Sequence, residues 1–112
     1  MEISVRRRSD VDIFQLRGAL RLGPPVDEFR QAVDEALAQG NVQLVVNLAE
    51  VPMVDSSGIG ALVKIMTSIK QRGGAMKLVS PSKMTIQTLR LVGVLQLFEV
   101  FEDENAAVAS FG

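Results

Sequence analysis

The sequence predicts an α/β fold in which a small, mostly parallel sheet begins with an antiparallel hairpin and carries about four helices. Three observations support this fold class: strand-like and helix-like segments alternate from Pro24 onward, residues 42–51 are almost continuously apolar, and the first sixteen residues alternate loosely between apolar and polar types. Continuously apolar strands are typical of parallel sheets covered on both faces, and alternating strands and helices form such sheets through right-handed crossovers.

The opening hairpin is predicted from residues 3–5 and 11–16, which lie on either side of the segment "RRSD". Apolar and polar residues alternate in both segments, as in two short strands joined by a tight turn. The basic run from Arg6 to Arg8 is interpreted as a solvated strand end, because no aromatic residue is interleaved as in a nucleic-acid-binding patch.

A first helix is predicted to begin in "LGPP" and to end before Gly40. Proline suits the first turn of a helix, where its missing N–H has no intrahelical partner, and acidic residues in that turn suit the helix dipole. The expected apolar face, at helical spacing, consists of Val26, Phe29, Val33 and Leu37.

The remaining elements follow in alternation. Residues 42–51 are expected to form a central strand, and the helix after Asp55 has its apolar face at Ile59, Leu62, Val63, Met66 and Ile69. A buried strand at 75–81, a helix at 82–93 closed by Gly93, a weak strand near 99–101 and a short terminal helix at 103–111 complete the prediction.

Composition excludes several classes of function. The 112 residues suit one domain spanning 1–112, 47% are hydrophobic, and the formal net charge is −1, so no nucleic-acid partner is predicted. Cysteine and histidine are both absent. Their absence rules out disulfides, thiolate metal sites, cysteine nucleophiles and every serine-histidine-acid triad. We therefore expect a protein that is not an enzyme and that has no cofactor and no metal.

No part of the sequence resembles a signal peptide or a membrane span, since no run of about 18 apolar residues occurs. We therefore expect no direct membrane insertion and a cytoplasmic location.

The stretch "VDSSGIGALV" combines a carboxylate, two hydroxyls and two glycines at the start of a predicted helix. Asp55, Ser56 or Ser57 could cap that helix, but one capping oxygen is enough. A dinucleotide-binding loop is disfavoured because Val63 occupies the third glycine position. A serine nucleophile is disfavoured because no histidine exists and nothing indicates that Lys64 is desolvated.

The interpretation that fits best is a hydroxyl that accepts a phosphoryl group from a partner's active site. Phosphoserine carries about −1.5 to −2 charges and is favourable at a helix N-terminus, so the fold would survive the modification. A partner surface covering Ser56 would instead meet a new dianion. A like-charge contact at about 4 Å costs roughly 1 to 4 kcal/mol, and each 1.4 kcal/mol is about tenfold in affinity.

The segments "LVVNLAEVPMVDSSGIGALVKI", "RGGAMKLVSPS" and "LVGVLQLFEVF" resemble a STAS domain of the bacterial anti-sigma-factor antagonist family. The resemblance covers nearly the whole chain, and "DSSG" after a buried strand is its sharpest element. It implies a STAS fold and a partner-switching function. The unphosphorylated protein would bind an anti-sigma factor that is also a serine kinase, and so free a sigma factor. Phosphorylation by that kinase would release the antagonist, and a serine phosphatase would restore the unphosphorylated antagonist.

Carried over by motif, the resemblance implies that Ser56 is the phosphoacceptor and that Asp55, Ser57 and Gly58 shape its loop. Many relatives carry an acidic residue where this chain has Arg21. The expected partner-binding surface combines the "DSSG" loop, the "LGPP" loop and an exposed stripe of the helix after Asp55. Its candidate residues are Arg21, Gly60, Lys64 and Thr67. The alternative is a non-switching STAS subunit or adaptor of a lipid-transport ABC system or a sensory complex.

Overall fold

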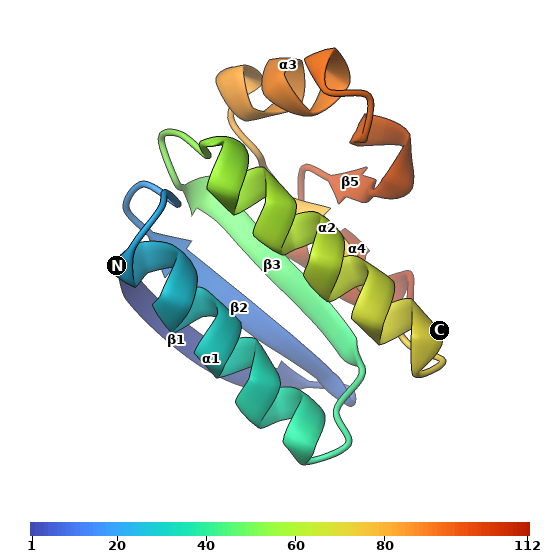
Figure 1. Ribbon diagram of the computed structural model, residues 1–112. Coiled ribbons are helices and arrows are strands. Elements are labelled where there is room, and N and C mark those ends of the chain that lie inside the picture. Colours follow the sequence, from blue (N-terminus) through green and yellow to red (C-terminus); the bar gives the residue numbers. More distant parts are fainter.

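The five strands form one sheet in the sequential order β1-β2-β3-β4-β5 (Figure 1), in a computed structural model that describes all residues 1–112. β1 and β2 are antiparallel, whereas β2, β3, β4 and β5 are parallel to one another. The predicted fold class, with an antiparallel hairpin and a central third strand, is confirmed. The strands are β1 (Glu2–Arg8), β2 (Val11–Arg17), β3 (Gln43–Glu50), β4 (Ala75–Val79) and β5 (Glu99–Phe101).

The helices cover both faces of the sheet. α1 and α2 pack side by side on one face, α4 lies on the other, and α3 lies beyond the sheet near the start of α2 (Figure 1). The helices are α1 (Pro24–Ala38), α2 (Ser56–Gln71), α3 (Lys83–Leu91) and α4 (Glu104–Ala109), with a short 3-10 turn η1 (Leu95–Leu97). None of them is long and apolar enough to cross a membrane.

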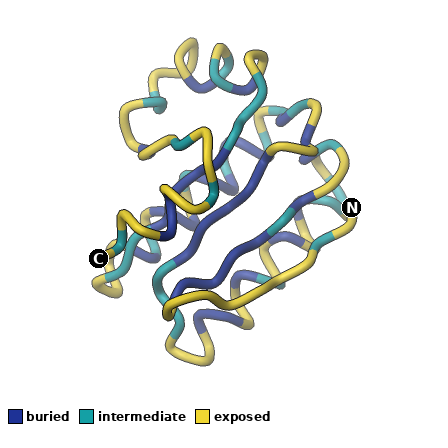
Figure 2. Tube along the Cα trace, turned by 180° about the vertical axis from the view of Figure 1, so that it is seen from behind, coloured by how far each residue is buried: buried dark blue, intermediate teal, exposed yellow.

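Side-chain alternation along the strands divides the core into two clusters. The larger one has 23 buried residues and lies beneath α1 and α2, where Phe14 and Val46 face the helices. Their neighbours Ile13 and Val45 point the other way, into a smaller cluster of 6 buried residues beneath α4. Figure 2 shows the same pattern from behind: β2, β3 and β4 are largely buried, while β1 is an exposed edge strand.

The hairpin turn is tighter than "RRSD" suggested. Only Ser9 and Asp10 lie between the strands, both with positive φ (50° and 66°), as in the mirror-image turns that match the twist of a hairpin. The basic run is therefore part of β1. Its interpretation as a solvated strand end is confirmed, since Arg6, Arg7 and Arg8 are all exposed at the end of β1, and each guanidinium group also pairs with a neighbouring side chain.

Two of those pairs attach the first strand to the last helix. Arg6 Nη2 lies 2.9 Å from Glu104 Oε1, and Arg8 Nη1 donates to Asn105 Oδ1 over 2.9 Å. Arg7 Nε lies 2.9 Å from Asp12 Oδ1 within the hairpin. Burial of the Glu104 side chain opposes its ionisation, but hydrogen bonds from Asn47 and Arg6 and the nearby guanidinium charges lower the pKa of Glu104.

A buried lysine binds the C-terminal segment on the face of the sheet that α4 covers. Lys77 is only 6% exposed, and its Nζ lies 3.1 Å from Glu99 Oε2 and donates to Ser110 Oγ over 2.6 Å. The ammonium also lies 4.4 Å from the ring centroid of Phe111 and 5.8 Å from that of Phe101, a cation–π arrangement. This buried charge is therefore satisfied from several directions.

Candidate functional site

α2 begins at Ser56, and Asp55 is its N-cap. Asp55 has an extended backbone (φ −83°, ψ −178°), and its Oδ1 accepts a hydrogen bond of 2.8 Å from the Gly58 N–H. The sequence left the cap open among three residues, and the structure assigns it to Asp55. Neither Ser56 nor Ser57 makes a side-chain hydrogen bond, and Ser56 is exposed whereas Ser57 is half-buried. The Ser56 hydroxyl is therefore free.

The loop before α2 is joined to the loop before α1 by a short parallel bridge between Leu20 and Val54. The Leu20 N–H donates to the Met53 carbonyl over 3.0 Å, and the Asp55 N–H donates to the Leu20 carbonyl over 3.1 Å. Both loops follow the carboxyl ends of adjacent parallel strands, where functional groups of such sheets gather. "LGPP" and "DSSG" therefore form one surface.

Gly58 allows the two loops to approach this closely. A Cβ at Gly58 would lie 2.5 Å from the Leu20 carbonyl oxygen and 2.6 Å from Val54 Cγ1, which is closer than real Cβ contacts come. Gly60, two residues further along α2, has open space where its Cβ would be. The two glycines of the motif thus have different roles, and only Gly58 is required by packing.

The Asp55 carboxylate is held at both oxygens. In addition to the bond at Oδ1, its Oδ2 accepts a hydrogen bond of 3.0 Å from the Leu22 N–H. These bonds from Gly58 and Leu22 lower the pKa of Asp55, and the positive charge of Arg21 adds to the effect. Asp55 is therefore a fixed negative charge directly before Ser56 at neutral pH.

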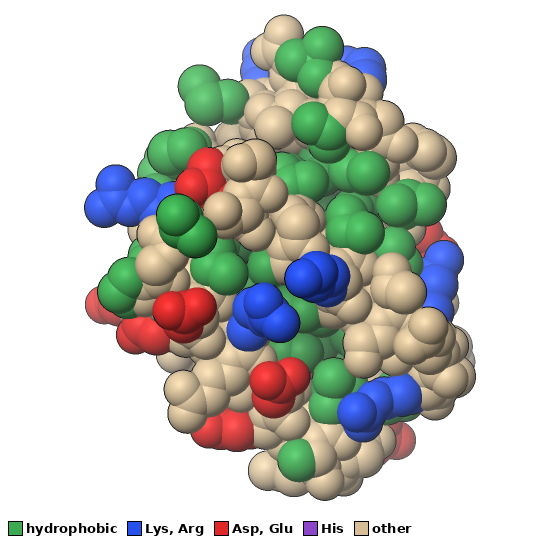
Figure 3. Space-filling view, in the orientation of Figure 1, with side chains coloured by type: hydrophobic (Ala, Val, Ile, Leu, Met, Phe, Trp, Pro, Cys, Tyr) green, Lys and Arg blue, Asp and Glu red, His purple; other side chains and the backbone are tan.

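The expected partner stripe lies along the outer side of α2. Lys64 and Thr67 are exposed and Gly60 is half-buried, while the Thr67 hydroxyl donates to the Val63 carbonyl over 2.9 Å. Lys64 borders a shallow hollow between α1 and α2 that Arg30 and Asp34 also line. Figure 3 shows that this face carries both signs of charge around an apolar seam. Any partner of this face must therefore match a mixed pattern.

The family model for the STAS domain matches residues 2–107. The chain belongs to the STAS family. A curated relative from Thermotoga maritima, provisionally named an anti-sigma factor antagonist, is 29% identical over 67% of this chain and 66% of its own length.

Solved structures share the fold over more of the chain. The crystal structure of a protein of the same provisional name from Thermotoga maritima has a TM-score of 0.90 at 26% identity and covers 96% of this chain and 92% of that chain. The phosphorylated form of SpoIIAA, a Bacillus cell fate determinant, has a TM-score of 0.79 at 20% identity and covers 99% of this chain and 100% of that chain.

Lys64 follows Ser56 by eight positions on α2, about 12 Å along the axis, which is too far for it to take the Ser56 proton. The structure has no cluster of three or more side chains that could hold a metal ion. The free Ser56 hydroxyl lies at the N-terminus of α2, a position that accommodates an added phosphate.

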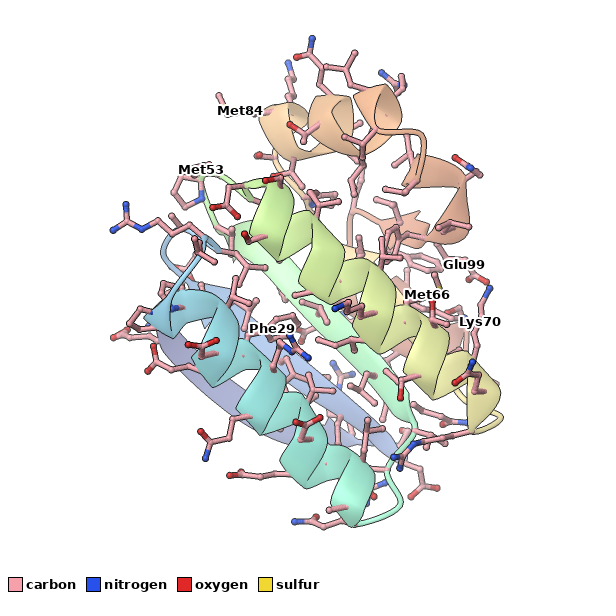
Figure 4. The ribbon with its side chains drawn as sticks, viewed as in Figure 1. Phe29, Met53, Met66, Lys70, Met84 and Glu99 are labelled. Carbon is pink, nitrogen blue, oxygen red and sulfur yellow. The ribbon has the colours of Figure 1, made fainter.

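Two apolar side chains of this STAS domain are exposed near the loops: Leu22 belongs to the "LGPP" loop expected at the partner surface, and Met84 was missed as a site candidate. Leu22 is 75% exposed and Met84 is 62% exposed. Leu22 belongs to the loop bonded to Asp55, and Met84 lies with Met53 at the end of the molecule where α2 and α3 begin (Figure 4). Leu22 falls outside the apolar spacing of the first predicted helix, because the chain turns at Gly23 (φ 102°) directly after it.

Proposed function

We propose that this STAS domain, taken as one domain over residues 1–112, is a non-enzymatic anti-sigma-factor antagonist that is switched off by phosphorylation of Ser56. The unmodified protein binds an anti-sigma factor and thereby frees a sigma factor. The anti-sigma factor is also the kinase: the Ser56 oxygen attacks the γ-phosphorus of its bound ATP, ADP leaves, and the hydroxyl proton passes to a base of the kinase. A serine phosphatase reverses the modification. Such partners act in the cytoplasm, so we expect the protein there.

The observation that carries this proposal is the exposed Ser56 hydroxyl, which makes no hydrogen bond and follows a rigid cap. A kinase needs an accessible hydroxyl on a backbone of fixed shape. Because Asp55 rather than Ser56 caps α2, a phosphate on Ser56 removes no bond that the helix needs. The free N–H groups and the dipole of α2 also favour the added charge.

Phosphorylation of Ser56 affects partner binding more than it affects the fold. A surface that covers the Ser56 loop must desolvate the new dianion or face it with its own charges, and both cost affinity. The names of the relatives support the choice of an anti-sigma factor as this partner.

The direct test is incubation with ATP and each kinase-like anti-sigma factor of the source genome, followed by intact-mass measurement. We expect the wild type and Ser57→Ala to gain one phosphate and Ser56→Ala to gain none. Modification of Ser56→Ala would contradict the proposed acceptor. Binding without any phosphorylation would favour instead a non-switching STAS subunit or adaptor of a transport or sensory complex.

A further inference from the structure

The backbone of Arg21 is held next to Asp55 by hydrogen bonds that its two neighbours make. The residue before it, Leu20, accepts from the Asp55 N–H over 3.1 Å, and the residue after it, Leu22, donates to Asp55 Oδ2 over 3.0 Å. The Arg21 carbonyl itself accepts from the Val26 N–H at the start of α1 over 3.3 Å. The backbone of Arg21 is thereby fixed beside the residue that precedes Ser56.

The guanidinium of Arg21 has no partner of its own. It is exposed and forms no ion pair within 4 Å, whereas Arg6, Arg7 and Arg8 each do. Its charge still acts on Asp55 and contributes to the lowered pKa of that carboxyl. Arg21 therefore offers an unpaired planar cation at the Ser56 loop, a group suited to bidentate contact with a phosphate.

A phosphate on Ser56 would create a local excess of negative charge. Asp55 cannot turn away from it, because both carboxylate oxygens are engaged by backbone N–H groups. Phosphoserine and this carboxylate together carry about −2.5 to −3 charges, of which the phosphate contributes about −1.5 to −2. A cation within reach would relieve this repulsion.

We propose that Arg21 is the intramolecular counter-charge of phosphorylated Ser56, an inference that rests on the proposed function of that serine. On phosphorylation the guanidinium binds the phosphate oxygens, while Asp55 keeps its two backbone bonds. The loop then carries about −1.5 to −2 charges instead of −2.5 to −3. The ion pair holds the phosphate in one orientation over the loop. It also lowers the second pKa of the phosphate, which therefore stays dianionic at lower pH. Arg21 is thus an unpaired cation of the partner surface before phosphorylation, and it binds the phosphate of Ser56 afterwards.

The test uses protein with phosphoserine incorporated at position 56 during translation, so that it needs no kinase. Phosphorus NMR titration gives the second pKa of the phosphate, which is about 6 for free phosphoserine. We expect Arg21→Gln to raise this pKa by about 0.5 to 1 unit relative to the wild type, and Arg21→Lys to restore part of the difference.

Two matched variants remove other cations. Lys64 lies two turns along α2, and Lys83 opens α3 at the same edge of the sheet. We expect Lys64→Gln and Lys83→Gln to leave the phosphate pKa unchanged. An unchanged pKa in Arg21→Gln, or an equal rise in Lys83→Gln, would overturn the assignment. A failure of any kinase to modify Ser56 would instead count against the proposed function alone.

Discussion

The Leu22 N–H donates a hydrogen bond of 3.0 Å to Asp55 Oδ2, although the two residues are 33 positions apart in the chain. The other oxygen of the same carboxylate caps α2 through the Gly58 N–H. One side chain thus fixes both the start of the helix that carries Ser56 and the neighbouring loop. The shape of the candidate site depends on this double contact.

Replacing Asp55 is expected to destabilise the protein. Asp55→Ala removes both bonds and should lower the free energy of unfolding by about 1 to 2 kcal/mol, the upper range for an N-cap. Asp55→Asn keeps one oxygen for Gly58 but turns an amide NH2 toward the Leu22 N–H, so an intermediate loss is expected. Urea unfolding measures both, and an Asp55→Ala protein as stable as the wild type would contradict this role.

The two glycines of the motif provide a matched pair. Gly58→Ala should lower the free energy of unfolding by about 1 to 3 kcal/mol, because the new Cβ would lie 2.5 Å from the Leu20 carbonyl oxygen. Gly60→Ala meets open space within α2 and should raise stability by about 0.5 to 1 kcal/mol. Thermal unfolding of the two proteins compares them directly. Equal changes in the same direction would refute the difference in packing.

Stability should fall in acid, because two carboxyl groups have lowered pKa values in the folded protein. Glu104 and Asp55 titrate below their ordinary values of 4.5 and 3.8. Their contribution is therefore complete above those ordinary values and is lost as pH falls through the folded values. The urea midpoint of the wild type should decline below about pH 4.5, and the midpoint of Glu104→Gln should decline less steeply with falling pH. A Glu104→Gln curve parallel to the wild type would exclude this contribution.

The outer side of α2 should carry partner binding. Lys64→Glu and Thr67→Glu are expected to weaken binding to the cognate anti-sigma factor by about tenfold or more, since a reversed or added charge must be buried against it. Lys70→Glu is the control, because Lys70 lies near the other end of the same helix (Figure 4). Isothermal titration calorimetry measures the three affinities. An equal loss in all three variants would indicate a general charge effect rather than this surface.

Local patterns in the sequence were sufficient for most of the fold. The apolar spacing of α1 and α2 and the continuous apolar run of β3 reflect burial, which sequence periodicity records directly. The family resemblance implied that the "LGPP" and "DSSG" loops share one surface, and they do so because the parallel strands β2 and β3 end at one edge of the sheet. Contacts between distant segments were not predictable. Arg6 pairs with Glu104, which lies 98 positions away. Lys77 lies in the predicted buried strand at 75–81, but its partners Glu99 and Ser110 come from later elements that local patterns do not indicate.

The candidate site was predictable to a similar depth. The position of Ser56 at a helix start was evident, but the choice of Asp55 as the cap depends on backbone geometry that three neighbouring polar residues could equally provide. The position of Arg21 beside Asp55 depends on the bridge between Leu20 and Val54, a contact formed only in the folded chain.

The most direct test of the switch compares the affinity of the cognate anti-sigma factor for the unmodified protein and for protein with phosphoserine incorporated at position 56. Circular dichroism should first show that both are equally folded. We predict that phosphorylation weakens binding by at least about tenfold, as expected for one like-charge contact at the interface, because the loop still gains net negative charge when Arg21 pairs with the phosphate. Equal affinities of two folded proteins would contradict the proposed switch.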